Sequence, residues 1–201
     1  MAKIYTKYGD NGYTYTKQNP KTPKNHLLVH ILGDLDELNA NLGHLDSLVA
    51  SAKHKIEKKT SKIDSVIECL QKIEFFIQTQ IEMIFNIGAF IGYNTDLSVD
   101  SLSEITKSIE NFIDEEESKN GNLQNFVLPV GTTASTFAHI CRSVCRRAER
   151  NFYDMSDKEK SVETLLAITT YLNRLSDSLF SISRSLNRVE RFKEILWTKK
   201  D

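Results

Sequence analysis

Apolar residues recur at alternating spacings of three and four positions along most of this chain, which is the pattern of amphipathic helices. Polar or glycine-containing breaks, where helices begin and end, separate these apolar stripes. Glycine and proline are scarce, at 8 and 3 of 201 residues, which favours long helices over turns. We therefore predict an all-α fold with five helices, at about residues 26–52, 62–90, 101–120, 132–155 and 161–197.

The first 25 residues do not share this pattern. β-branched and aromatic residues at 4–6 and 13–16 flank the sequence GDNG at 9–12. One interpretation is a short hairpin or an extended arm with a glycine turn. The other is a loop whose backbone N–H groups approach a phosphate, with lysine and threonine side chains adding contacts. The residues alone leave both interpretations open.

The helix expected at 132–155 carries a concentrated polar face in the sequence RSVCRRAER, residues 142–150. At about 100° per residue, Arg142, Arg146 and Glu149 fall on one side of the helix, with Arg150 at the edge. The like-charged arginine pairs four residues apart each cost an isolated helix about 0.2–0.5 kcal/mol. Such a face needs an anion or a neighbouring carboxylate. Several guanidiniums suit a polyphosphate, because each can donate two N–H groups to phosphate oxygens.

Other segments supply groups that can meet this face. Asn173 and Asp177 lie four residues apart on the next helix, which a short loop should pack antiparallel to the first. Asp36 is either a solvated carboxylate or a partner for one of the arginines. In the apolar loop 122–131, Phe126 either plugs the bundle or lines a ligand site. The acidic run 114–117 is expected to be a solvated helix end without chemistry.

Composition narrows the class of protein. A net charge of −1 argues against general nucleic-acid binding, and no apolar run approaches the roughly 20 residues that cross a membrane. The N-terminus lacks the apolar segment of a secretory signal. We therefore expect a cytoplasmic protein, or an organellar one if a presequence was removed. Cys69, Cys141 and Cys145 fit small core residues better than a metal site.

The sequence contains no evident nucleophile–base pair, paired carboxylates or zinc cluster. Its polar residues are better suited to position an anionic substrate than to attack it. The residues thus predict one domain, 1–201, in which an arm at 1–25 serves an anion site on a helical bundle at 26–197.

Five motifs, in order along nearly the whole chain, resemble one known family. They are KIYTKYGDNGYT at 3–14, GDLDELNANLG at 33–43, FVLPVGT at 126–132, RSVCRRAER at 142–150 and YLNRLSDSLF at 171–180. Together they resemble the PduO-type ATP:cob(I)alamin adenosyltransferases. The resemblance implies a ferritin-like up-and-down bundle of five helices, assembled as a homotrimer with active sites between subunits.

The resemblance also implies an activity: transfer of the 5′-deoxyadenosyl group of ATP to the cobalt of cob(I)alamin, with release of triphosphate. Because the cobalt is the nucleophile, the protein needs none of its own. Magnesium is expected to arrive on the ATP phosphates rather than at a protein site of its own. A cobalamin reductase and an adenosylcobalamin-dependent enzyme are the implied partners, and no nucleic acid or membrane is expected.

The family's functional residues can be carried over motif by motif. The implied ATP-binding residues are Thr6, Lys7, Tyr8, Gly9, Thr14, Tyr15, Lys24, Arg146, Arg147, Glu149, Arg150 and Asn173. The implied catalytic residues are Arg146, Asn173 and Phe126, and the implied corrinoid-binding residues are Phe126, Arg142 and Asp177. Asp36 is expected to pair with Arg142 of the adjacent subunit. Phe126 is expected to crowd the lower face of the corrin and to help remove its lower axial ligand.

Two departures from the family pattern bear on these expectations. Val130 stands where the family usually has glycine, and it would be strained at a positive φ. The segment after Lys24 also differs from the usual acidic and arginine-containing one. The departure at Val130 motivates an alternative, a non-catalytic ATP or corrinoid carrier or sensor on the same bundle. A third possibility is a helical scaffold whose arginine face only pairs across an interface.

Overall fold

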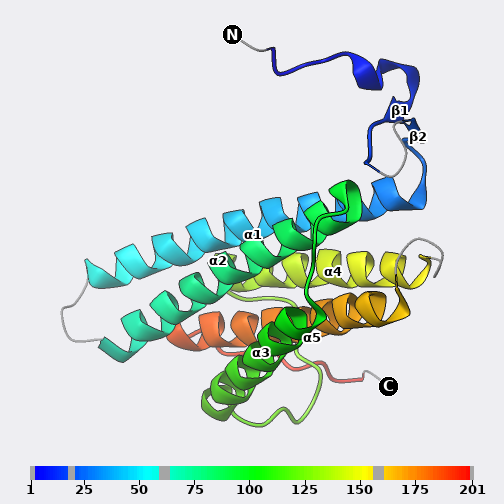
Figure 1. Ribbon diagram of the computed structural model, residues 1–201. Helices are drawn as coiled ribbons and strands as arrows, with labels where there is room; N and C mark the ends of the chain where they lie inside the picture. The colour runs from blue at the N-terminus through cyan, green and yellow to red at the C-terminus, as the bar shows by residue number, and fades with distance from the viewer. Residues whose placement is uncertain (1–2, 18–20, 59–63, 156–160, 200–201) are drawn as a thin grey trace.

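Five α-helices make up most of the chain in the computed structural model, which describes residues 3–17, 21–58, 64–155 and 161–199. They are α1 (Leu27–Glu57), α2 (Asp64–Tyr93), α3 (Val99–Asn120), α4 (Thr133–Tyr153) and α5 (Val162–Val189). The predicted all-α fold is therefore confirmed. Figure 1 shows α1, α2, α4 and α5 lying lengthwise beside one another, while α3 crosses at an angle against α5.

The apolar stripes read from the sequence are the core of this bundle. Buried residues from all five helices, among them Leu42, Ile77, Ile109, Ala148 and Leu179, form one hydrophobic cluster. α1 packs against both α2 and α4, and α5 packs against α4 and α3. The antiparallel pairing of α4 and α5 places the RSVCRRAER and YLNRLSDSLF motifs opposite each other.

The cysteines belong to this core, as predicted. Cys69, Cys141 and Cys145 are all free thiols and all buried. Burial raises the pKa of Cys141 to about 12 and raises that of Cys145 further. These thiols therefore remain protonated and act as small apolar side chains.

Two helix ends differ from prediction. α1 continues to Glu57, past the expected end near Ala52, while residues 59–63, which include the expected start of the next helix, lie outside the described part. α3 begins at Val99 rather than at the capping box expected from Ser101. Its N-cap is Ser98, whose Oγ accepts a hydrogen bond from the backbone N–H of Ser101 at 3.2 Å.

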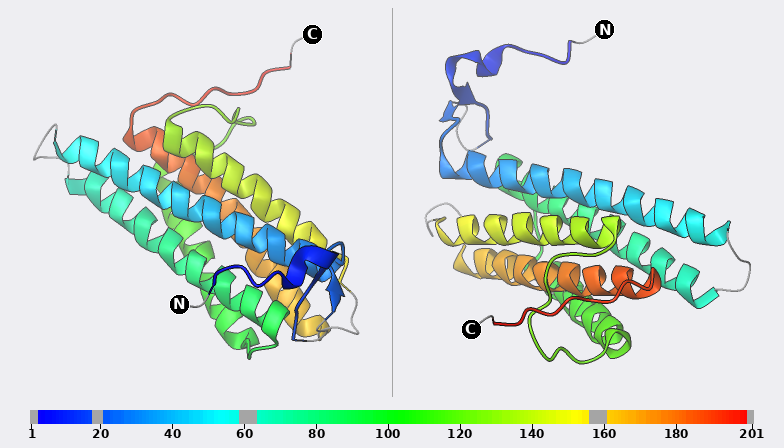
Figure 2. Two further views of the ribbon diagram at one scale, coloured as in Figure 1. Left: turned by 90° about the horizontal axis from the view of Figure 1, so that it is seen from above. Right: turned by 180° about the vertical axis from the view of Figure 1, so that it is seen from behind.

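The fifth helix ends at Val189 and not near Trp197, so that prediction was wrong. Arg191 adopts the left-handed conformation, with φ 58°, at the position after the C-cap where glycine is usual. The N–H of Phe192 then bonds to the carbonyl of Asn187 at 2.8 Å, which closes the helix in a Schellman motif. The following residues leave the bundle and run back beside the loop that precedes α4 (Figure 2).

The acidic run at the end of α3 is solvated at Asp114 and Glu115, as predicted, but not at Glu116 and Glu117. Glu116 is fully buried, and its carboxylate accepts hydrogen bonds from Ser185 at 2.7 Å and Arg188 at 3.0 Å. Glu117 pairs with Arg184 of α5. The prediction failed because the last turn of α3 packs on the last two turns of α5, where those arginines lie.

The N-terminal arm contains a hairpin with a pairing other than the expected one. β1 (Tyr13–Thr14) pairs antiparallel with β2 (Thr22–Pro23), whereas residues 4–6 form no strand. A 3₁₀ turn, η1 (Tyr8–Asn11), precedes β1. The N–H of Lys17 bonds to the carbonyl of Gly92 at 3.0 Å and ties the arm to the end of α2. The arm rises from the start of α1 and turns back along the bundle, standing clear of it (Figure 1).

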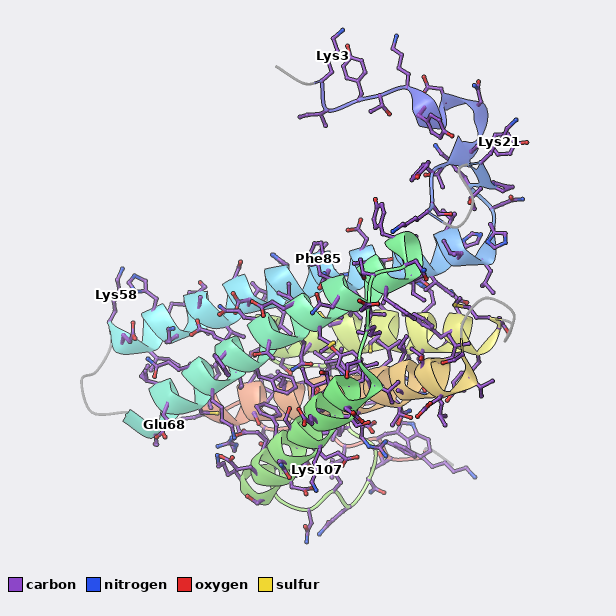
Figure 3. All side chains as sticks on the ribbon, in the orientation of Figure 1. Lys3, Lys21, Lys58, Glu68, Phe85 and Lys107 are labelled. Carbon is purple, nitrogen blue, oxygen red and sulfur yellow. The ribbon has the colours of Figure 1, made fainter. Side chains whose placement is uncertain are left out.

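α2 has more apolar surface than this single chain covers. By length and composition alone its residues Ser65–Tyr93 would suffice to cross a membrane, a test that core helices of soluble proteins also pass. One side faces the core, but Phe75 and Phe85 on the other side are 74% and 65% exposed. Phe85 points outward from the layer of α1 and α2 in Figure 3. This outer face of α2 is suited to contact with another protein surface.

Candidate functional site between α4 and α5

The polar side chains predicted to share one face of α4 lie on its surface or near it. Thr132 caps the helix, with its hydroxyl accepting from the N–H of Ser135 at 3.4 Å. Arg146 and Arg150 are exposed, whereas Glu149 is only 9% exposed. The apolar residues on the opposite face are buried in the core. The helix therefore presents two guanidiniums to solvent beside one nearly buried carboxylate.

That carboxylate is held by the facing helix. The side-chain amide of Asn173 donates a hydrogen bond to Glu149 Oε1 at 3.0 Å. Arg174 Nη1 donates to Asn173 Oδ1 at 2.8 Å, and Arg174 Nε donates to Glu110 of α3 at 2.8 Å. This chain of contacts fixes the orientation of the Asn173 amide. Three helices thus hold the Asn173–Glu149 pair in one position.

Arg147 points away from this group, toward α1. Its Nε donates to Asp34 Oδ1 at 2.8 Å, and its Nη2 pairs with Glu37. Asp34 also accepts from the amide of Asn151 at 2.6 Å. The hydrogen bond that Arg147 donates to Asp34 raises the pKa of Arg147. Sequence reasoning missed Asp34 and Glu37, although both belong to the GDLDELNANLG motif.

A small cavity, about 260 Å³, brings together three of the predicted residues. It is lined by Ile113, Glu117, Leu123, Arg142, Arg146, Ser176, Asp177, Phe180 and Ser181. The Nε of Arg142 is buried and has no hydrogen-bond partner within the described residues. Because a buried donor without an acceptor is unfavourable, we expect Arg142 Nε to take an acceptor from water or from another chain.

His139 lies one turn before Arg142 on the same face of α4. It is 7% exposed, and its ring lies 6.0 Å from that of Phe180, measured between centroids. Burial, with the charge of Arg142 as a smaller cause, lowers the pKa of His139 to about 4. The imidazole is therefore neutral at physiological pH.

Phe126 lies on the surface and does not plug the bundle. Its side chain is 80% exposed. The backbone around it pairs with the C-terminal segment, with Trp197 N donating to Phe126 O at 2.7 Å and Leu128 N donating to Ile195 O at 2.9 Å. The interpretation of Phe126 as a plug of the bundle is therefore wrong, and its role at a ligand site stays a prediction.

Val130 is not strained in this loop. The only residues other than glycine with positive φ in the described part are Lys7, Asn94 and Arg191. Val130 instead closes a tight turn, in which its N–H bonds to the carbonyl of Leu128 at 2.8 Å. The conformational requirement for glycine falls on Gly131, with φ 155°. The departure from the family pattern at Val130 therefore brings no backbone strain to this loop.

The predicted arm residues gather in a second group, at the start of α1. The backbone N–H of Lys24 bonds to the carbonyl of Gly12 at 2.9 Å, and its Nζ lies 3.0 Å from where a Cβ on Gly9 would be. Thr6 accepts from the N–H of Tyr8 at 3.4 Å. Thr14, Tyr15 and the exposed Asp36 line one open cavity of about 510 Å³.

The two groups of predicted residues are apart within one chain. The arm extends away from α1, while the arginine and asparagine motifs lie between α4 and α5 (Figures 1 and 2). The arm group contributes Lys24 and the backbone around Gly9, and the α4–α5 group contributes Arg146 and the Asn173–Glu149 pair. That each group holds part of an anion site stays a prediction.

Comparison with known proteins identifies the family. Residues 4–186 match the family model for cobalamin adenosyltransferase. The chain is 32% identical over 201 residues to the corrinoid adenosyltransferase MMAB of Homo sapiens, covering 100% of this chain and 75% of that protein. It is 31% identical over 202 residues to the cobalamin adenosyltransferase of Cupriavidus metallidurans, covering 99% and 96%.

A solved structure gives the same result. A variant of the PduO-type ATP:corrinoid adenosyltransferase from Lactobacillus reuteri, complexed with cobalamin and ATP, superposes with a TM-score of 0.77. The sequences are 25% identical, and the match covers 97% of this chain and 96% of the other. The family model spans both the arm and the bundle. This chain therefore belongs to the cobalamin adenosyltransferase family.

Proposed function

We propose that this protein transfers the 5′-deoxyadenosyl group of ATP to the cobalt of cob(I)alamin, forming adenosylcobalamin and releasing triphosphate. The observation that carries the proposal is the arrangement around Arg146 in a member of this family. An exposed guanidinium lies beside a carboxylate, Glu149, that Asn173 holds in place. That arrangement can bind and orient a polyphosphate without attacking it.

On the nucleotide side, we propose that Arg146 and Arg150 hold the triphosphate. Their charges would stabilise the negative charge that grows on the leaving group. Arm residues Thr6, Lys7, Tyr8, Gly9, Thr14, Tyr15 and Lys24 would close over the nucleotide. For Arg147, the contacts with Asp34 and Glu37 favour a bracing role between α4 and α1 over direct phosphate contact.

Magnesium is proposed to enter bound to the ATP phosphates. Within the described residues no group of three or more His, Cys, Asp or Glu side chains is placed to hold a metal. Glu149 lies about one turn from Arg146 on α4, and Asn173 fixes its orientation. A single carboxylate suits Mg²⁺ that keeps most of its ligands from phosphate and water.

On the corrinoid side, we propose that the exposed ring of Phe126 crowds the lower face of the corrin. Arg142 and Asp177, which line the same cavity as Arg146, would contact the corrinoid as well. When bound, the reduced corrinoid supplies the nucleophile for the reaction. The contribution of the chain is to hold the two substrates in line and to exclude water.

We propose a homotrimer with the active site between subunits. The unpaired Nε of Arg142, the exposed Asp36 and the outer face of α2 support this assembly. Asp36 of one subunit would supply an acceptor for Arg142 of the next. The arm of one subunit would then meet the α4–α5 group of another.

The chemistry also implies partners. Cob(I)alamin is formed by reduction, so a cobalamin reductase should supply the substrate. An adenosylcobalamin-dependent enzyme should consume the product. We propose that the protein works in the cytoplasm. Its two proposed substrates, ATP and reduced corrinoid, would both be present there.

One assay tests the proposed function. The protein is mixed with Mg-ATP and chemically reduced cobalamin, and both the cobalamin spectrum and the release of triphosphate are followed. Formation of adenosylcobalamin with equal triphosphate supports the proposal. An unchanged spectrum, under conditions in which a known adenosyltransferase converts the same cobalamin, would refute it. Arg146→Ala separates a scaffold, which would lose assembly, from an enzyme, which would lose ATP affinity but stay assembled.

A further inference from the structure

The position of the Phe126 ring must be fixed by something other than its own packing. A ring that is 80% exposed is not held by the packing of its own side chain. Its position depends on the backbone of residues 121–132, which contains no helix and no regular strand. Whatever fixes that backbone therefore determines where the ring meets a ligand.

The two ends of this loop are held by the last turns of α5. At the first end, Arg184 Nη2 donates to the carbonyls of Asn120 at 3.2 Å and Gly121 at 3.1 Å. At the other end, the amide of Asn187 accepts from Thr132 N at 3.0 Å and donates to Val130 O at 3.4 Å. Both ends are thus tied to one helix.

The middle of the loop, where Phe126 lies, is held by the C-terminal segment. The N–H of Trp197 and the carbonyl of Ile195 bond to the backbone of Phe126 and Leu128, and Val127 bridges to Leu196. Ile195, Leu196 and Trp197 are all exposed, and an open cavity of about 390 Å³ lies between this segment and the start of the loop. About half of the surface of each of these side chains stays exposed, at 39–49%, so apolar packing holds the segment only in part.

One ion pair anchors the segment to the bundle. The side chain of Glu194 accepts from Arg184 Nε at 3.1 Å and from Nη2 at 3.3 Å. Arg184 is itself 3% exposed and also pairs with Glu117 at the end of α3. A buried guanidinium with several partners is a rigid anchor, because its planar donors fix the geometry.

We propose that Arg184 and Glu194 form a clasp that holds the C-terminal segment on the Phe126 loop and so positions Phe126 for the corrinoid. Both are positioning residues, acting through the backbone of residues 126–128. The inference rests on the proposed function for its ligand, the corrinoid. Glu194 is the better residue to change, because Arg184 without it still keeps Glu117 and the carbonyls at 120 and 121.

The test compares full-length wild type with Glu194→Ala, Glu194→Gln and the control Lys199→Ala, an exposed residue in the same segment. Trp197 is the only tryptophan in the chain, so its fluorescence reports release of the segment directly. For Glu194→Ala we expect red-shifted emission and a kcat/KM for cob(I)alamin lower by about tenfold or more, since small misplacements are costly. The KM for ATP should stay close to that of wild type, whereas the melting temperature should fall by a few degrees because the buried Arg184 Nε loses its acceptor. Glu194→Gln retains an acceptor oxygen and should lose less.

A double-mutant cycle adds a readout that general destabilisation would not move. If the clasp acts through Phe126, Glu194→Ala should have little further effect in a Phe126→Ala background. Released Trp197 with unchanged corrinoid kinetics would overturn the proposal, and so would unchanged fluorescence or additive effects in the cycle. A parallel loss of ATP and corrinoid parameters would overturn it as well.

The same experiment separates this inference from the proposed function. Wild-type turnover tests the function alone. Cobalamin titrated in the presence of ATP, followed by quenching of Trp197, measures corrinoid binding without turnover. Weaker binding by Glu194→Ala than by wild type supports the clasp even in protein that forms no product. Equal binding refutes it whether or not the wild type is active.

Discussion

Arg147 Nε donates a hydrogen bond to Asp34 Oδ1 at 2.8 Å and so joins α4 to α1, although its sequence neighbour Arg146 lines a cavity on another side of the helix. Consecutive positions on a helix differ by about 100°, so two adjacent arginines serve different surfaces. One is already neutralised by carboxylates of its own chain. The other remains available to a ligand.

This difference predicts that alanine substitutions of the two arginines affect two different quantities. Arg146→Ala should weaken ATP binding strongly and leave the free energy of unfolding unchanged. Arg147→Ala should lower the free energy of unfolding by about 1–2 kcal/mol, because Asp34 loses a charged donor at a largely buried site. Calorimetry with ATP and urea unfolding measure the two quantities. Equal losses of ATP affinity in both variants would contradict the separation.

The pairing of Asp36 with Arg142 predicts a charge-reversal rescue. Asp36→Arg should prevent trimer formation, because two guanidiniums would face each other at every interface, and like charges there cost several kcal/mol. The double variant Asp36→Arg with Arg142→Asp should restore the trimer. Sedimentation velocity measures the assembly state. A fully assembled single variant would show that the two residues do not meet between subunits.

Much of this fold could be predicted because its signals are local. The apolar stripes fix which side of each helix is buried, and Thr132 caps α4 through a residue only three positions away. The polar face carrying Arg146 and Glu149 follows from helical periodicity alone. The residues that make up each of these patterns lie within a few helical turns of one another in the sequence.

The wrong predictions depend on backbone conformation or on contacts between residues far apart in the sequence. Arg191 ends α5 in a conformation normally taken by glycine, so the residue type carries no stop signal. Glu117 is bound to Arg184, 67 residues away, and Arg147 to Asp34, 113 residues away. Such partners become visible only after the helices are placed. The strand pairing in the arm was missed because strands of two residues have almost no sequence pattern.

Gly131 should be far less tolerant of substitution than Val130. A Cβ on Gly131 would lie 2.1 Å from Asn187 Oδ1 and would displace the amide that holds Thr132 N. Gly131→Ala should therefore cost about 2–3 kcal/mol of stability and reduce turnover of the corrinoid. Val130→Gly, as control, should cost less than about 1 kcal/mol. Similar urea midpoints for the two variants would refute this account of the loop.

The lowered pKa of His139 predicts that the folded protein loses stability in acid. Its folded-state pKa of about 4 lies below the usual 6.5, so the unfolded chain binds the proton first as the pH falls. Stability from this group is complete above pH 6.5 and is lost between about 6.5 and 4, to a total of about 3 kcal/mol.

A variant isolates this contribution from that of the carboxylates. His139→Gln cannot titrate, so its free energy of unfolding should fall less steeply than that of wild type over the same interval. Urea unfolding at pH 7 and pH 4.5 gives both slopes. Parallel curves would show that His139 is not held neutral in the folded protein.

The outer face of α2, with Phe75 and Phe85 exposed, has a thermodynamic consequence. If another copy of the chain covers this face, folding and assembly are linked by mass action. The melting temperature should then rise with protein concentration, and dilution alone should destabilise the protein. The concentration of the protein in a cell would then affect its stability as much as its sequence does. At low concentration more chains would be unassembled, and the loss of those that unfold would lower the concentration further.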